Sequence, residues 1–370
     1  MRENVKYYQE DNYAQLVRTV DLKKDFTNND FVYVDEFAYD FLWRVQLKEP
    51  NIVLPNIGAN IGEKYYVSPK DLPKEKNVLG PNAILLRSKC NDTHFVYFRL
   101  STSSYDNEMK KLVGASGQPK FNKTDLKKVR LFIPSLKEQK KISYFLGLLE
   151  ERIATQNKII EDLKKLKSAI IEKVFNGKHS EKLQLNDVGS YIRGLTYSSN
   201  DVVEHGGTFV MRSNNIINGS LLDYNNNVVF VNKQMSAEQQ LQNGDVVICM
   251  ANGSSSLVGK SSFYDGSCHS PITVGAFCGI YRSKEPIVKW LFQTNKYRRY
   301  IWNSLQGGNG AIANLNGEDI LNMSFSIPNA TIKDTCVKML TSMDSALENN
   351  MSLCALYTLQ KQYLLRQMFI

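Results

Sequence analysis

The segment Gly253 to Ser261 (GSSSLVGKS) combines glycines, a lysine and serines in an order that could hold a phosphate. A P-loop wraps its backbone NH groups around phosphates at one fixed glycine spacing, and a helix starts at its lysine. Here the glycines are one residue too far apart, and Ser262-Phe263-Tyr264 continues like a strand. The segment therefore predicts a turn between two strands, with Lys260 near a DNA phosphate, rather than nucleotide hydrolysis.

Other catalytic and metal-binding patterns are missing from the sequence. The six cysteines form no CxxC pair, and the four histidines show no ligand spacing. There is no Asn/Asp-Pro-Pro-aromatic methyltransferase signature and no glycine-rich cofactor loop after a strand. We therefore expect a chain that is not an enzyme and that holds no metal or cofactor of its own.

The charge of the chain points only weakly to nucleic acid. The net charge is +9, but residues 179 to 328 contain 11 basic and 11 acidic side chains and are neutral overall. DNA binding there would need local basic side chains rather than a general positive field. The apolar runs are too short for a membrane span, and the amino terminus lacks the apolar core of a signal peptide, so we expect a cytoplasmic protein without membrane contact.

Side chains that suit phosphates and base edges occur at several places in the chain. The two arginines that follow apolar strand residues, Arg18 and Arg212, could equally be partners in structural salt bridges. Arg298 lies near the end of an amphipathic stretch whose Trp290, Leu291 and Ile301 are expected in the core. The alternative to DNA contact is that Arg298 is simply part of the solvated face of this stretch. The candidate DNA contacts are Arg18, Thr19, Lys64, Arg212, Ser213, Asn214, Asn252, Ser254, Ser255, Lys260 and Arg298.

A single offset of 194 residues aligns landmarks along the chain. In the early part, the segment from Val17 to Leu22 aligns with that from Met211 to Ile216, and Asn51-Ile52-Val53-Leu54 with Asp245-Val246-Val247-Ile248. Seven later positions are identical in the two copies: Asn122, Asp125, Ile133, Pro134, Leu146, Lys167 and Phe175 match Asn316, Asp319, Ile327, Pro328, Leu340, Lys361 and Phe369. The chain therefore consists of two copies of one unit.

Each copy changes from strand-rich to helical periodicity at its Ile-Pro pair, which ends at Pro134 or Pro328. Afterwards apolar residues alternate spacings of three and four, as in a coiled-coil seam. Polar residues interrupt both seams at matching places, Gln156 with Asn350 and Lys167 with Lys361. These four either fix the register of the helices or face solvent at the edge of the seam.

These patterns predict an α+β protein. Two mixed domains with many strands, residues 1–134 and 179–328, alternate with two long helices, residues 135–178 and 329–370. Neither helix can bury its apolar stripe alone, so we expect an antiparallel pair related by an approximate twofold axis. At ~1.5 Å per residue such a helix is roughly 58 Å long, which exceeds one DNA turn of ~34 to 36 Å. It could act as a ruler between two half-sites.

The chain resembles the specificity subunits of type I restriction-modification systems. The similarity is strongest in LFIPSLKEQKKISYFLGLLEERIATQNKIIEDLKKLKSAIIEKVFNGK, which contains Pro134, Glu138, Gln139 and Ile142. It also includes IRGLTYSS, MRSNNI, GDVVICMANGS and VGKSS in the second copy, and it covers essentially the whole chain.

This resemblance implies that each mixed domain is a target-recognition domain that reads one half of a bipartite DNA site, while the helices set the gap. It further implies that the helices dock modification subunits, which bind S-adenosylmethionine and methylate adenine, and that restriction subunits join through them. The residues expected on the docking helices are Glu138, Gln139, Ile142, Leu146, Leu149, Ile153, Leu340, Met343 and Leu347.

The sequence departs from the family pattern in two places. The second helix has Ile332 and Lys333 where the first has Glu138 and Gln139, so its docking is expected to differ in detail. Met1 aligns with Leu195, so the first copy has no counterpart of KLQLNDVGSYIRG and is expected to lack a strand and a turn. Either an upstream start supplies this segment, or the first domain tolerates an open edge.

Two other classes of function compete with this interpretation. A nuclease or methyltransferase with an unfamiliar motif would bind cofactor or modify DNA alone. A coiled-coil scaffold that assembles proteins without touching DNA would show no salt-dependent DNA binding.

Overall fold

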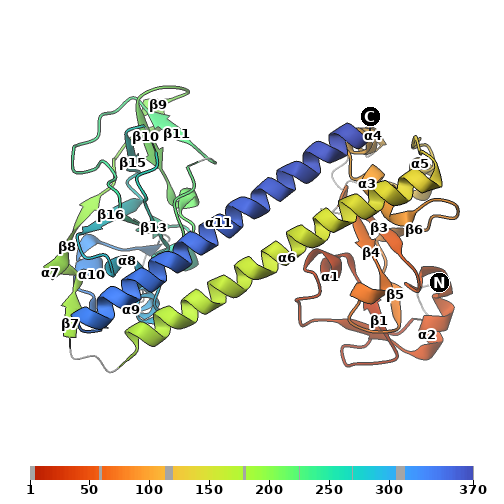
Figure 1. The fold of residues 1–370 in the computed structure, drawn as a ribbon, viewed down its shortest axis with the longest axis horizontal. Coiled ribbons are helices and arrows are strands. Elements are labelled where there is room, and N and C mark those ends of the chain that lie inside the picture. Colours follow the sequence, from red (N-terminus) through yellow and green to blue (C-terminus); the bar gives the residue numbers. More distant parts are fainter. Residues whose placement is uncertain are drawn as a thin grey trace. The chain divides into compact units, whose positions relative to one another are not determined.

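The computed structural model of the chain describes residues 5–57, 61–112, 120–177, 181–224, 226–268, 270–305 and 313–369. These residues form two compact units that share two long helices (Figure 1). Unit 1 comprises Met1–Asn157 with Ser352–Ile370, and unit 2 comprises Lys158–Met351. The expected α+β class, with two mixed units and a pair of long helices, is confirmed.

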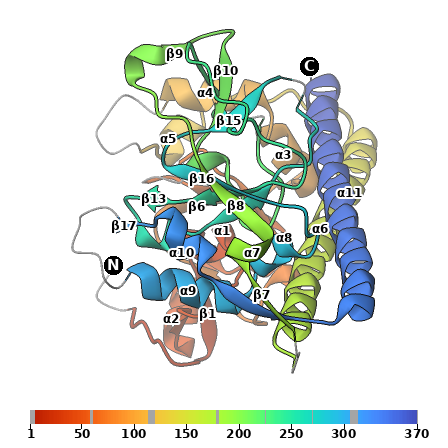
Figure 2. The same ribbon diagram turned by 90° about the vertical axis from the view of Figure 1, so that its left-hand side faces the viewer.

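Unit 2 contains two four-stranded sheets in the orders β15-β10-β11-β9 and β14-β12-β16-β8. The first sheet comprises β9 (Val202–Val203), β10 (Thr208–Met211), β11 (Val229–Val231) and β15 (Ile272–Val274). The second comprises β8 (Gly189–Arg193), β12 (Val246–Cys249), β14 (Ser261–Phe263) and β16 (Cys278–Ser283), and Figure 2 shows β8 beside β16. Two short pairs join β7 (Glu181–Gln184) to β18 (Ser324–Ile327) and β13 (Ala251–Asn252) to β17 (Ala313–Asn314). The short helices are α7 (Leu185–Val188), α8 (Val288–Leu291), α9 (Asn295–Leu305) and α10 (Gly317–Leu321).

The central strand β12 separates two apolar cores. Its residues are all buried, and because side chains of a strand alternate between faces, Val246 and Ile248 enter one core while Val247 and Cys249 enter the other. The first core includes Trp290 of α8, and the second contains side chains of β10 and β15. This two-sided burial explains the unbroken apolar run that the sequence has at this place.

Unit 1 repeats this plan with shorter elements. Its sheets have the orders β2-β1-β5 and β4-β3-β6. The strands are β1 (Ala14–Val17), β2 (Val32–Val34), β3 (Asn51–Pro55), β4 (Tyr65–Val67), β5 (Asn77–Leu79) and β6 (Ala83–Leu86). The helices are α1 (Thr19–Lys23), α2 (Glu36–Phe41), α3 (Thr93–Leu100), α4 (Ser103–Leu112) and α5 (Lys123–Leu126).

The strand registers confirm the internal repeat. Leu16 pairs with Val78 in parallel, and the matching residue Val210 pairs in parallel with Thr273, one residue beyond the offset of 194. In the second sheets, Val53 pairs with Leu85 as Val247 pairs with Ile280. Asn122 and Asn316 both cap a short helix and share a capping box with the aspartate three residues later. The described part of unit 1 has no counterpart of β7, α7 and β8, as the sequence predicted.

The two long helices are α6 (Leu136–Phe175) and α11 (Ala330–Met368), close to the bounds that their periodicity predicted. They lie antiparallel within each unit: in unit 1 the Arg152 guanidinium donates to the Tyr357 hydroxyl, and in unit 2 Lys167 pairs with Asp344. The seam residues Leu146 and Leu340 are fully buried. No helix in the described ranges is long and apolar enough to cross a membrane.

The polar interruptions of the seams make specific contacts. The ammonium group of Lys167 is 2.6 Å from the carboxylate of Asp344, and both side chains are 6% exposed. The matching pair in unit 1 joins Lys361 to Glu150, with side-chain exposures of 22% and 27%. Gln156 is also buried. These lysines therefore pair across the two helices rather than facing solvent.

Candidate nucleic-acid interface

The P-loop-like segment of unit 2 joins two strands, as the sequence predicted. It leaves β13 at Asn252, forms a short 3-10 turn at Ser255–Leu257 and enters β14 at Ser261. The Asn252 side chain accepts a hydrogen bond from the Ser254 amide at 3.0 Å, and the hydroxyl groups of Ser254 and Ser256 are 2.8 Å apart. The loop therefore presents hydroxyl and amide groups and is not built to wrap a nucleotide phosphate.

A second predicted segment, Arg212 to Asn214, lies against this loop. The Asn252 amide donates to the Ser213 hydroxyl at 3.5 Å, across 39 residues of sequence. Buried Asn215 fixes the turn, because its side-chain oxygen accepts from the Arg212 amide and its nitrogen donates to main-chain carbonyl groups further along. Arg212 and Asn214 themselves are exposed. The fold thus brings together two groups of predicted DNA contacts.

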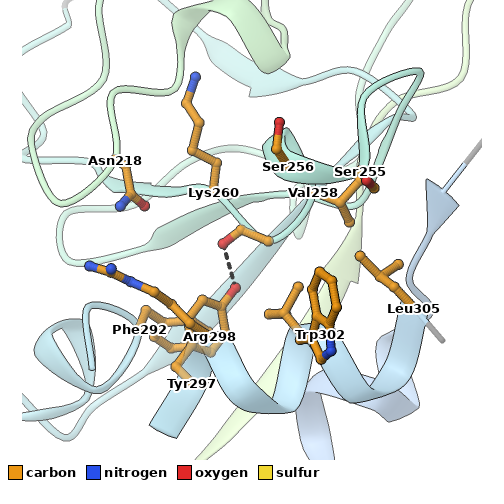
Figure 3. Close-up of a pocket in the computed structure, with 12 residues that line it drawn as sticks. Asn218, Ser255, Ser256, Val258, Lys260, Phe292, Tyr297, Arg298, Trp302 and Leu305 are labelled. Carbon is orange, nitrogen blue, oxygen red and sulfur yellow. Dashed lines mark hydrogen bonds between the residues drawn. The ribbon is translucent and has the colours of Figure 1, made fainter. Parts of the chain in front are cut away.

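A hollow of about 430 Å³ lies between the loop and α9 (Figure 3). Arg298 and Asn218 lie at one end of it, and Trp302 and Leu305 at the other, while Lys260 extends away from α9. Trp302 is 65% exposed. Sequence reasoning did not select Trp302, although its position one helical turn after Arg298 was a usable signal.

The helix α9 holds the loop in place from below. The Tyr297 hydroxyl donates to the Gly259 carbonyl at 2.7 Å, and burial raises the pKa of Tyr297, so the hydroxyl keeps its proton for this bond. Gly259 has φ +80°, and a Cβ there would lie 2.7 Å from Ile301. Only glycine fits this position. As expected from the sequence, Trp290, Leu291 and Ile301 face the core, whereas Arg298 is exposed.

Three cations of this face are available to a ligand. The ion pairs between described residues of unit 2 use Lys165, Lys167, Arg282, Lys289 and Lys333, and none uses Arg212, Lys260 or Arg298. A cation without a carboxylate partner can exchange its counterions for phosphate at little cost. With the serines and asparagines of the loop, these side chains have the chemistry of a polyanion-binding surface.

The cations predicted to contact DNA in unit 1 are engaged within the unit. Arg18 forms two side-chain hydrogen bonds with buried Asp21, which raise the pKa of Arg18, and it also lies 3.4 Å from Asp30. Lys64 pairs with Asp106. Thr19 begins α1 beside them. The alternative reading of Arg18 as a structural salt-bridge partner is therefore confirmed, while DNA contact by these three residues stays a prediction.

The residues expected to dock partner subunits have internal contacts of their own. Gln139 is 2% exposed and donates to Asn91 and to the Pro134 carbonyl, while accepting from the Asp92 amide. At the matching position of α11, Lys333 pairs with Glu285, the counterpart of Asn91. Glu138 caps α6 through Ser135. The remaining predicted residues lie in or beside the seams as buried or partly buried side chains: Ile142, Leu146, Leu149, Ile153, Leu340, Met343 and Leu347.

An outward stripe on α11 was missed. Leu356, Leu359 and Tyr363 are 61%, 60% and 62% exposed. Their spacings of three and four residues place them on one face of the helix, and this spacing was visible in the sequence. In unit 1 this face has the character of a partner-binding surface.

Comparisons with known proteins agree with this architecture. Residues 8–165 match the family model described as type I restriction modification DNA specificity domain. The chain is 33% identical over 158 residues to the type I restriction enzyme EcoKI specificity subunit of Escherichia coli (strain K12). This alignment covers 40% of this chain and 31% of that protein. It is 32% identical over 156 residues to the StySPI specificity subunit of Salmonella potsdam, again covering 40% and 31%. The matched part is thus 31% of the length of these curated relatives.

Solved structures share the fold. The crystal structure of the type I restriction-modification system S subunit from M. genitalium aligns with a TM-score of 0.58 and 15% identity, over 87% of this chain and 83% of that one. A chain from a study of complex assembly and conformational transition of the type I R-M system aligns with a TM-score of 0.50 and 11% identity, over 100% and 92%. The chain thus shares its fold, with repeated units and paired helices, with these solved S-subunit structures, and its residues 8–165 are similar to the type I restriction modification DNA specificity domain.

Proposed function

We propose that this chain is a DNA-recognition subunit of a type I restriction-modification complex. Each unit reads one half of a bipartite site, and α6 and α11 set the gap between the halves. The observation that carries this proposal is the repeat itself, because two copies of one fold on paired helices suit two half-sites. The helices dock modification subunits, and restriction subunits join through those.

The chain itself is proposed to be non-catalytic and to act in the cytoplasm. S-adenosylmethionine binds to the modification subunit, which transfers the methyl group to adenine. In the described residues, no group of three or more His, Cys, Asp or Glu side chains could hold a metal ion. The chemistry of the hydroxyl, amide and cationic side chains around Asn252 supports DNA contact instead.

The test is to express the chain with its candidate modification subunit and to map methylated adenines. A gapped, asymmetric motif is the expected result. Methylation of a continuous short site, or none despite a folded complex, would contradict the proposal. DNA modification by the purified chain alone would favour the enzyme alternative, and the absence of salt-dependent DNA binding would favour a scaffold that does not touch DNA.

Within unit 2 the proposed DNA-facing set is Arg212, Ser213, Asn214, Asn252, Ser254, Ser255, Lys260 and Arg298. Replacing Arg212, Lys260 or Arg298 by alanine should weaken DNA binding by the complex and lower the slope of log affinity against log salt by about 1 each if each contacts a phosphate. Lys284→Ala, at another exposed lysine of unit 2, is the matched control and should leave the slope unchanged. Equal effects of the control and the three variants on the salt slope would show that this face does not contact DNA phosphates.

A further inference from the structure

The turn between β15 and β16, residues 275–278, which we name the tip turn, carries an exposed aromatic side chain. The Cys278 amide donates to the Gly275 carbonyl at 2.8 Å, which makes Ala276 and Phe277 the two central residues of a β-turn. Phe277 is 67% exposed. Glycine, proline, asparagine, aspartate and serine are the residues that favour turns, so local backbone geometry gives no reason for a phenylalanine here.

The matching turn of unit 1 has ordinary turn residues. There Pro81 and Asn82 lie between β5 and β6, and the Asn82 carbonyl accepts from the Asn56 amide. At the same place of unit 2 the Phe277 carbonyl accepts from the Met250 amide. Asn82 has φ +70°, a conformation that asparagine adopts more readily than most residues. The backbone therefore explains the residues of this turn in unit 1, but not the phenylalanine in unit 2.

Main-chain hydrogen bonds place the tip turn between the two segments of unit 2 that hold predicted DNA contacts. On one side the Gly275 amide donates to the Met211 carbonyl at 2.8 Å, one residue before the first segment begins. On the other side the Phe277 carbonyl accepts from the Ala251 amide at 3.1 Å, one residue before Asn252. The exposed ring therefore belongs to the same surface as these candidate DNA contacts.

The residues that follow β8 fix the tip turn from a third side. The Leu195 amide donates to the Val274 carbonyl at 2.7 Å. A Cβ on Gly194 would lie 2.2 Å from the Gly275 carbonyl oxygen, so this close approach requires a glycine. Because its main chain is held by three neighbouring segments, the tip turn presents Phe277 from a fixed backbone, as precise recognition of a ligand requires.

The side chains on this surface match the major-groove edge of an A·T base pair. Asparagine amides bond to N6 and N7 of adenine, and an apolar side chain contacts the 5-methyl group of thymine. Asn214 is exposed and Asn252 is partly exposed, so both amides are accessible. Phe277 adds the apolar contact that these polar side chains lack.

We propose that Phe277 reads a thymine 5-methyl group in the half-site bound by unit 2. This assignment rests on the proposed DNA recognition and names one base-specific contact within it. The ring packs on the methyl group in the major groove, and burial of the two apolar surfaces favours thymine over cytosine, which has no methyl group.

A protein partner is the other kind of occupant for an exposed phenylalanine. Protein interfaces have a core of several apolar side chains that are buried together. The structure describes all of residues 211–214, 250–254 and 275–277, and among them Phe277 is the only exposed large apolar side chain. A single ring among polar groups suits one methyl group better than a protein core, so the observations favour DNA.

The experiment uses the full chain in complex with its modification subunit and labelled duplexes that carry the methylated motif. Each thymine of the two half-sites is replaced in turn by deoxyuridine, which lacks only the 5-methyl group. At least one replacement should weaken binding about fourfold in fluorescence anisotropy, because the burial of about one methyl group is lost. In the Phe277→Ala complex the same replacement should leave the affinity unchanged.

The matched control is Val202→Ala, at another exposed apolar residue of unit 2. Val202 lies on β9, at the opposite edge of the sheet from β15. This variant should keep the full difference in affinity between the thymine and deoxyuridine duplexes. A thymine replaced within the gap of the motif provides the control on the DNA, and the unfolding midpoint verifies that each variant is folded.

Each contrary outcome identifies what fails. If no deoxyuridine replacement weakens binding by the parent complex, or if the thymine preference survives in Phe277→Ala, the assignment is overturned, while a gapped methylated motif leaves the proposed function standing. Loss of the modification subunit from the Phe277→Ala complex in gel filtration, with the thymine preference intact, also overturns it and assigns the ring to a protein contact. A parent complex that neither binds DNA nor methylates it overturns the proposed function and this assignment together.

Discussion

The buried pair of Lys167 and Asp344 holds the recognition fold of unit 2 to the two long helices. Lys167 reaches from α6 to Asp344 of α11 and also donates to the Gly219 carbonyl at 3.0 Å. Asp344 in turn accepts from the Trp290 indole and pairs with Lys289 at 3.1 Å. One buried carboxylate therefore joins both helices and the recognition fold of unit 2.

Removing this carboxylate should destabilise unit 2 strongly. Asp344→Leu leaves the buried ammonium group of Lys167 unpaired, which should cost about 3–5 kcal/mol of unfolding free energy in urea titrations. The double variant Lys167→Met with Asp344→Leu should recover much of the loss, because no buried charge is left alone. Lys165→Met, at an exposed pair on the same helix, should have no measurable effect. A double variant no more stable than Asp344→Leu would contradict this account.

The matching carboxylate of unit 1, Glu150, should make stability depend on pH. Burial alone would raise the pKa of Glu150, but its hydrogen bond with His94 and the charge of Lys361 lower the pKa below its ordinary value of 4.5. Because the folded-state pKa is the lower one, the stabilisation is present above the unfolded-state pKa and is lost as the pH falls through the folded-state pKa.

The pH experiment compares the parent chain with Glu150→Gln. Between about pH 5 and pH 3 the unfolding free energy of the parent should fall more steeply than that of the variant. Glu151→Gln, at the exposed neighbouring glutamate, serves as the control and should follow the parent. Parallel curves for the parent and Glu150→Gln would show that this carboxylate does not carry the acid sensitivity.

The packing of strand β8 against strand β16 depends on a glycine. Tyr191 of β8 lies over Gly279 of β16, where a Cβ would be 2.3 Å from the tyrosine ring. In unit 1 the position that matches by strand pairing is Ile84, which lies opposite Leu54 as Gly279 lies opposite Ile248, and Ile84 is 5% exposed and packs in the core. The described residues of unit 1 include no counterpart of β8, and this unit has a large side chain where unit 2 accommodates the Tyr191 ring.

Gly279→Ala should therefore displace Tyr191 and destabilise unit 2 by about 1–3 kcal/mol through overpacking. Adding Tyr191→Ala should make the glycine substitution much less costly, so the two effects should be strongly non-additive in a denaturant double-mutant cycle. Gly253→Ala meets no heavy atom within 4 Å and provides the control. Additive effects on the unfolding free energy would show that the packing of the Tyr191 ring does not depend on Gly279.

The sequence predicted elements better than it predicted contacts. The long helices and the turn at Ser254 follow from local periodicity and turn residues, and the repeat follows from one offset. The pairing of Arg18 with Asp21 was left open because the same residue types suit DNA and a buried carboxylate. The contact between Ser213 and Asn252, and the hollow beside Trp302, depend on segments far apart in the chain that meet only after folding.

At the scale of the whole molecule, the contacts divide the chain in the middle of its long helices rather than at their ends. The boundary follows Asn157 in α6 and precedes Ser352 in α11. Just on the unit 1 side of it, Cys354 donates to Asn157 at 3.2 Å, so the two breaks face each other across the pair. Each unit therefore contains one end of both helices. The boundary is the place where the length of the helices can change without disturbing the core of either unit.

Inserting one heptad at both breaks should lengthen the helix pair while keeping the seam in phase, because seven residues restore the same face. At ~1.5 Å per residue the pair gains roughly 10.5 Å, equivalent to about three base pairs at ~3.4 Å each. If the helices set the gap, the methylated motif should keep both half-sites and gain about three base pairs between them. A heptad in α6 alone mismatches the pair and should abolish methylation. An unchanged gap in a folded, active double insertion would mean that something other than these helices spaces the two half-sites.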